Sequence, residues 1–206
     1  MQYNKIKKGG KMKKILTAVF LAVALVAPAF AGDTDLELIP KIGYLFSPDV
    51  TSKVDGNSIS DSKDSALSIG AELFFDMQNN FFLGAGLIWA ENHKFSDGDN
   101  KIGFTNVYVA AKYKILANGS EEDPFYIYPL AQLGAGLPGW EYSGFLRDFE
   151  IDGGLYWGIG VGGEVKNIVI ELIYGCNYAT MKASNADDTD LTYTAFRINV
   201  GYKFIL

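Results

Sequence analysis

The stretch 191–206 alternates between two kinds of side chain, and it constrains the fold more than any other part of the sequence. Successive side chains of a strand point to opposite faces, so residues two apart share a face. One face is apolar and aromatic from Phe196 onwards. Its residues are Thr192, Thr194, Phe196, Ile198, Val200, Tyr202, Phe204 and Leu206. The other face becomes mainly small or polar from Ala195 onwards. Such a two-faced final strand is typical of a transmembrane barrel that closes on itself.

Seven earlier segments show the same period of two. With the last stretch they predict eight strands, at 35–46, 65–76, 81–90, 105–115, 125–137, 154–164, 168–178 and 191–206. Long polar loops alternate with short turns along the chain, and we expect the loops at 47–64, 91–101, 138–152 and 179–190. Tilted strands of about 9–11 residues cross a bilayer, and this alternation puts all the long loops at one end of a barrel.

The face opposite the apolar one decides between a membrane barrel and a soluble ligand carrier of the lipocalin or streptavidin type. Glycines recur on that face: Gly70, Gly84, Gly86, Gly134, Gly136, Gly158, Gly160 and Gly162. Glycine weakens a strand that faces water but fits a narrow interior between large side chains. Aromatic residues also gather toward both ends of the apolar face, as expected at two membrane–water interfaces. We therefore predict an all-β fold, an eight-stranded antiparallel up-and-down transmembrane β-barrel.

The N-terminus has the pattern of a signal peptide. A basic stretch around Lys13 precedes the apolar run 15–26, and Ala29-Phe30-Ala31 fits a small-x-small cleavage site. We expect residues 1–31 to be the signal peptide, with Met12 as a more typical start than Met1, and residues 32–206 to form the barrel domain. Cleavage would remove six lysines and no acid, leaving 18 − 6 = 12 bases against 24 acids. A net charge of −12 argues against nucleic-acid binding, which needs a basic face.

The interior of the predicted barrel would hold four acids and five bases. They are Glu37, Lys41, Glu72, Lys112, Lys114, Glu164, Glu171, Arg197 and Lys203. Unpaired charges in so narrow a tube carry a large desolvation cost, so we expect them to pair or to hold water. Two hypotheses fit: an ion path or proton relay, and a plug of salt bridges. Eight strands leave just enough room for side chains, which favours the plug.

The layout of residues 33–206 resembles the small bacterial outer-membrane barrels of the OmpA, OmpX and opacity-protein type. The most specific match is Asn199, Gly201, Phe204 and Leu206, which fit the C-terminal signal by which the barrel assembly machinery recognises such proteins. The resemblance implies a place in the bacterial outer membrane. It implies as partners the outer-membrane lipid, lipopolysaccharide and the barrel assembly machinery.

The loops are the expected seat of function, because loops carry function on a rigid scaffold. The third loop offers a candidate contact patch for an extracellular ligand: Trp140, Tyr142, Phe145, Arg147 and Phe149. The alternative is that these aromatics pack on the barrel rim. We predict a non-enzymatic, monomeric surface barrel that serves envelope integrity, adhesion or surface interaction, without cofactor or metal.

Two other functions are open. Some eight-stranded barrels modify lipid A, and hydrolysis there needs a nucleophile activated by a base. His93 is the only histidine and Ser96 is near it, but both fall in a predicted loop and lack the His-x-Ser spacing of lipid A deacylases. A narrow pore is the third function, and eight strands make it the weakest.

Overall fold

The computed structural model describes residues 36–54, 57–62, 64–90, 93–94, 101–118, 124–141, 149–183 and 186–206. The expected signal peptide lies outside these residues. The described strands are β1 (Leu36–Val54), β2 (Asn57–Ser62), β3 (Ala66–Asp76), β4 (Phe81–Ala90), β5 (His93–Lys94), β6 (Lys101–Tyr113), β7 (Ile115–Asn118), β8 (Phe125–Glu141), β9 (Phe149–Val165), β10 (Ile168–Ala183), β11 (Ala186–Tyr202) and β12 (Phe204–Ile205). No helix among these residues is long and apolar enough to span a membrane.

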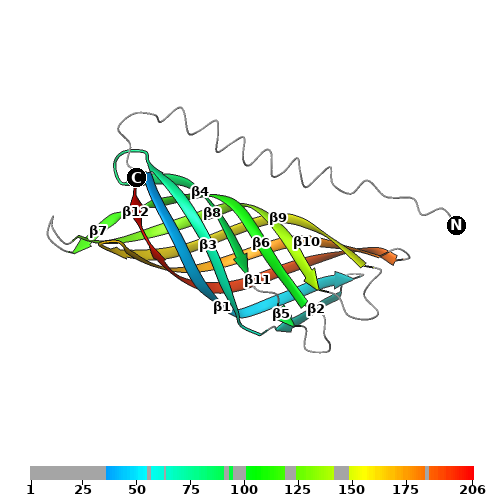
Figure 1. The fold of residues 1–206 in the computed structure, drawn as a ribbon. Coiled ribbons are helices and arrows are strands. Elements are labelled where there is room, and N and C mark those ends of the chain that lie inside the picture. Colours follow the sequence, from blue (N-terminus) through cyan, green and yellow to red (C-terminus); the bar gives the residue numbers. More distant parts are fainter. Residues whose placement is uncertain are drawn as a thin grey trace.

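The strands form one antiparallel sheet that closes on itself (Figure 1). The wall runs through β4, β3, β1, β11, β10, β9 and β8, and the pairing of β8 with β6 and of β6 with β4 completes the ring. Two strands are interrupted by one residue, at Lys114 between β6 and β7 and at Lys203 between β11 and β12. At both places the backbone N–H donates to a turn carbonyl, that of Asn80 at 2.9 Å and that of Asn167 at 2.7 Å. Counting each interrupted strand once, and leaving out the short strands β2 and β5, which pair only with β1 and β6 outside the ring, gives eight wall strands. This confirms the predicted fold class.

Burial alternates along the wall strands with a period of two. On β1, Ile39 is fully buried whereas Ile42 is 66% exposed, and the same contrast separates Phe74 from Ile69 on β3. A barrel needs this alternation, because one face of each strand fills the interior and the other meets the surroundings. The inside–outside assignment from the sequence is therefore confirmed.

The first and last wall strands meet along a continuous ladder. Lys41 pairs with Gly201, and Phe46 pairs with Phe196 farther along. The two phenylalanine rings stack on the outward face with their centroids 5.7 Å apart. This ladder is the seam of the barrel, and it joins the strands that the sequence pattern predicts as neighbours.

The long-loop end contains more strand than the sequence predicts. Segment 47–64 is expected as a loop, yet β1 continues to Val54 and returns as β2. Segment 179–190 likewise continues the β10–β11 ladder, as far as Ala183 opposite Ala186. These extensions are polar in sequence because a strand outside a membrane needs no continuous apolar face. Backbone hydrogen bonds form there without the side-chain pattern that reveals a strand.

The strands β8 and β9 separate from each other toward the long-loop end of the barrel. Their ladder ends with Gly136 opposite Gly154. Beyond that point β8 continues along β6, where Glu141 pairs with Lys101, and β9 continues along β10. Segment 138–152, expected as a loop, is therefore strand at both ends, and its central residues 142–148 lie outside the described part.

Candidate functional site in the barrel interior

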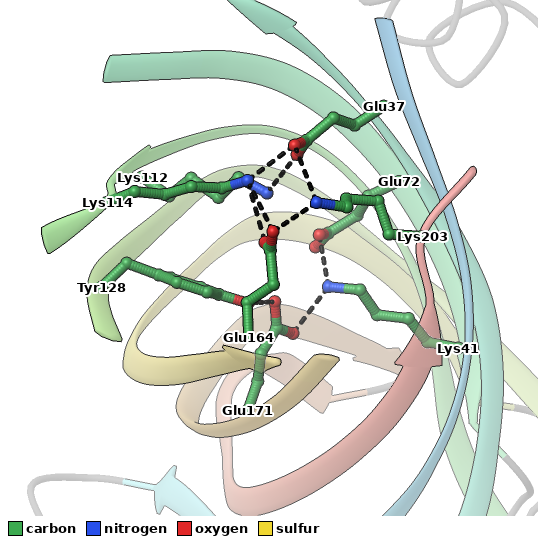
Figure 2. A network of polar contacts seen from close by, with 9 residues as sticks. All are labelled: Glu37, Lys41, Glu72, Lys112, Lys114, Tyr128, Glu164, Glu171 and Lys203. Atoms are coloured by element: carbon green, nitrogen blue, oxygen red, sulfur yellow. Dashed lines mark hydrogen bonds and ion pairs between the residues drawn. The ribbon is translucent and has the colours of Figure 1, made fainter. Parts of the chain in front are cut away.

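Eight of the nine charged residues predicted for the interior gather in the half of the barrel near the short turns (Figure 2). They come from β1, β3, β6, β9 and β10 and from the two strand interruptions. Each lies at an inward position of its strand, so the period of two points all of them at the barrel axis. Their exposures range from 1% at Glu72 to 8% at Lys203.

One group centres on Lys41. Its ammonium lies 2.6 Å from Glu171 and forms a second ion pair with Glu72. Tyrosine hydroxyls support both carboxylates: Tyr108 donates to Glu72 at 2.9 Å, and Tyr128 donates to Glu171 at 3.0 Å. A single lysine thus holds β1 to both β3 and β10 from inside the barrel.

A second group joins Glu37 and Glu164 through three lysines. The Glu37 carboxylate forms ion pairs with Lys112 at 2.8 Å and with Lys114 at 2.6 Å. The Glu164 carboxylate forms ion pairs with Lys114 at 2.8 Å and with Lys203. Lys203 further lies 3.8 Å from Glu37, so the charges form a connected network.

Aromatic rings complete the surroundings of two of these lysines. The ammonium of Lys112 lies 4.1 Å from the ring centroid of Phe74, and that of Lys114 lies 4.3 Å from the centroid of Phe82. Cations are attracted to the faces of aromatic rings within about 6 Å. The network is therefore enclosed by side chains that favour its positive members.

Buried ion pairs of this kind fix an arrangement more than they add stability. The attraction between the charges is offset by the cost of removing them from water, but removal of one partner leaves a buried charge unpaired. In a barrel, a slip of one residue would turn each of these side chains to the outside. The network therefore favours one register of the closed sheet.

A layer of tyrosines lies next to the charges. Tyr108, Tyr128 and Tyr156 are each 1% exposed, and Gln132 connects this layer to the network by donating to Glu72 at 2.9 Å. Interior glycines make room for the rings, because a Cβ at Gly162 would lie 2.3 Å from the ring of Tyr128. These tyrosines are not among the residues predicted for the site. The sequence signal that could have found them is that they share the inward phase of their strands with the predicted charges.

Arg197, the ninth predicted charge, lies apart from the eight others. Its Nη2 contacts the Tyr156 hydroxyl at 3.4 Å and Gln132 Oε1 at 3.5 Å. The sequence predicts that interior charges pair or hold water, but among the described residues Arg197 has a tyrosine and an amide as its hydrogen-bonding neighbours. Both distances are at the long limit of hydrogen bonding.

The interior toward the long loops is apolar. The cluster there consists of Leu45, Val50, Ala90, Phe104, Ala179, Leu191, Tyr193 and Ala195. The rings of Phe104 and Tyr193 pack with their centroids 5.3 Å apart. From the short turns to the long loops, the interior thus passes from a charged layer through a tyrosine layer to an apolar layer.

Of the four residues of the predicted assembly signal, two face the barrel interior and two face outward. Asn199 is 1% exposed and donates to Glu171 at 3.3 Å, and Gly201 faces inward beside Ile39. Phe204 and Leu206 are 46% and 68% exposed on the outside. The signal therefore overlaps the interior network on one face and the outer aromatic surface on the other.

The predicted loop patch lies mostly outside the described residues, which exclude Tyr142, Phe145 and Arg147. Trp140 and Phe149 lie near the loop ends of β8 and β9. His93 belongs to β5, opposite Ile102 of β6, and Ser96 also lies outside the described part. Among the described residues, no group of three or more His, Cys, Asp or Glu side chains could hold a metal ion.

Solved structures with a similar chain path share little sequence with this protein. The attachment invasion locus protein Ail of Yersinia pestis is 17% identical, with 82% of this chain and 98% of that chain covered and a TM-score of 0.42. The protease OmpT of Escherichia coli is 12% identical, with 86% and 98% covered and a TM-score of 0.45. Likenesses this distant carry no information on function.

The family itself is shown by sequence. No curated protein matches the chain significantly. The family model for the outer membrane protein beta-barrel domain matches residues 16–204, which is most of the chain. The chain therefore belongs to the outer membrane protein beta-barrel domain family, and its place is the bacterial outer membrane.

Proposed function

We propose that the protein is a non-enzymatic surface barrel whose interior is closed to ions and whose long-loop end makes the functional contacts. The observation that supports this best is the filled interior. Nine charged side chains at most 8% exposed, three buried tyrosines and an apolar cluster follow one another along the axis.

Two of the interior layers and the size of the barrel oppose the passage of an ion. In the charged layer, Lys41 pairs with both Glu72 and Glu171, and moving its side chain aside would leave two buried carboxylates without their shared cation. In the apolar layer, an ion would lose its hydration without gaining a ligand. An eight-stranded barrel offers only enough space for its own side chains. These three points favour a scaffold function and argue against a pore.

At the long-loop end, paired strand extensions hold the exposed surface in a fixed arrangement. The β1–β2 and β10–β11 extensions project past the apolar belt as paired strands, with ladders that reach Val54 opposite Asn57 and Ala183 opposite Ala186. Hydrogen-bonded hairpins present side chains with less conformational freedom than open loops do. Such a scaffold suits adhesion, surface interaction or support of the envelope through neighbouring lipopolysaccharide.

The other partners follow from the same surface. The exposed outward side chains, among them Ile42, Ile159 and Val200, would contact outer-membrane lipid. The C-terminal signal would bind the barrel assembly machinery during insertion, and the mature protein would work as a monomer. A contact patch around segment 142–148 would meet an extracellular ligand.

A loop-replacement series tests the proposal. We would replace 142–148 with a Gly/Ser linker of equal length and measure adherence of whole cells to host-like surfaces. Replacement of 119–123, the connection between β7 and β8, is the matched control. We expect adherence to fall in the first variant and to stay unchanged in the second. Unchanged adherence in both would contradict a contact role for this loop.

Lipid A analysis tests the non-enzymatic part. We expect the mass spectrum of lipid A to be the same with and without the gene. A missing or added acyl chain that depends on the protein would favour the lipid A-modifying enzyme instead, and His93→Ala would then identify or exclude its only histidine as a catalytic base.

A further inference from the structure

Arg197 is a buried cation without a carboxylate partner among the residues that the structure describes. Arg197 is 5% exposed, and its Nε has no hydrogen-bond partner within the described part of the chain. Its Nη2 makes two long contacts there, to Tyr156 and Gln132. A buried guanidinium normally gives its N–H groups to acceptors, because an unpaired buried donor is costly.

The charge count of the described interior agrees with this. Among the described residues, the buried charged side chains are four glutamates, four lysines and Arg197, so their formal charges sum to +1. Each of the lysines has at least one glutamate within ion-pair distance, and Arg197 is the one of these five cations without such a partner. A net charge in a low-dielectric interior is unfavourable unless a counter-ion compensates it.

A cavity lies beside this side chain, at the border of the tyrosine and apolar layers. Its accessible volume is about 20 Å³, which is enough for about one water-sized particle. Arg197, Asn106, Asn177, Tyr156 and Tyr193 contribute its polar lining. Within the described part of the chain, the Oδ1 atoms of both asparagines are buried without a hydrogen-bond partner. The cavity thus joins an unpaired guanidinium Nε to two asparagines with unpaired Oδ1 atoms.

We propose that this cavity binds one monovalent anion of chloride size. Its charge would offset that of the Arg197 guanidinium, and Nε–H would donate to it. Rotation of each asparagine amide by 180° would exchange Oδ1 with Nδ2, so that an N–H donor takes the place of the unpaired oxygen. A cation is disfavoured by the guanidinium, and phosphate or sulfate is too large for the space. The anion would link β11 to β6 and β10, which carry Arg197, Asn106 and Asn177.

Refolding in bromide tests the site without requiring an entry path, because the anion is present while the barrel closes. Crystals of protein refolded in sodium bromide are expected to show an anomalous peak within hydrogen-bond distance of Arg197 Nε. The peak should be lost in Arg197→Met and kept in Lys166→Met, which removes an exposed lysine of the β9–β10 turn. A peak that persists in Arg197→Met, or only a water in the wild-type cavity, would overturn the proposal.

A solution measurement covers the case in which Arg197→Met does not fold. Wild-type barrels refolded in sodium bromide or chloride should unfold at a higher urea midpoint than barrels refolded in sodium gluconate at the same ionic strength, since gluconate is too large to enter. Equal midpoints in all three salts would contradict a bound anion.

Discussion

Lys41→Met removes the cation that two buried carboxylates share. At an effective dielectric constant of about 20, opposite charges 2.6 Å apart, as in the Lys41–Glu171 pair, attract by about 6 kcal/mol before the desolvation cost is subtracted. The variant keeps the side-chain volume but leaves Glu72 and Glu171 facing each other without a cation. Losing one partner of a buried ion pair costs about 3–5 kcal/mol, and we expect the free energy of unfolding to fall by that amount. Urea unfolding of barrels refolded into lipid vesicles, followed by tryptophan fluorescence, measures it.

Lys182→Met is the matched control. Lys182 pairs with Asp152 at 2.7 Å, but the two side chains are 42% and 48% exposed, so solvent screens the pair and its loss should cost less than about 1 kcal/mol. Adding Glu72→Gln and Glu171→Gln to the Lys41→Met variant removes the stranded charges and should recover much of the stability. Equal losses in Lys41→Met and Lys182→Met, or a triple variant no more stable than Lys41→Met, would refute the reasoning.

Two further predictions concern packing and assembly. Gly162→Ala should destabilise the barrel by about 1–3 kcal/mol because its Cβ would overlap the Tyr128 ring, whereas Gly163→Ala, whose Cβ meets its nearest atom at 3.4 Å, should change the urea midpoint little; similar midpoints would contradict the fit of the interior. Phe204→Asp should abolish the heat-modifiable band of folded barrel on gels, because it places a charge on the lipid side and alters the assembly signal. Ile205→Asp, outside that signal, should insert better, and normal insertion of Phe204→Asp would contradict a role of Phe204 in lipid contact and assembly.

The wall of the barrel could be predicted because its signal is local. Ile39 and Ile42 differ in burial as the period of two requires, and the same rule places Lys41 and Glu171 inside. Which interior charges meet could not be predicted. Lys41 reaches Glu171 across 130 positions of sequence, and that contact depends on strand stagger and tilt, which no single strand encodes.

The parts that sequence reasoning missed have a common physical cause. The strands of segment 47–64 are held by backbone pairing, as where Thr51 lies opposite both Thr192 and Ser60, and their side chains show no apolar face. The apolar layer was missed for the opposite reason. Leu45 and Phe104 lie at inward positions where the pattern predicts polar residues, because the upper interior is sealed by hydrophobic packing.

Single-channel recording in planar lipid bilayers tests most directly whether the interior is closed. We expect no conductance steps above the leak of the bare bilayer for correctly folded protein, since the charged, tyrosine and apolar layers leave no continuous path. Reproducible ohmic steps that appear only with folded protein, and that change in size with Lys41→Met, would contradict this expectation and assign the charged network to ion conduction.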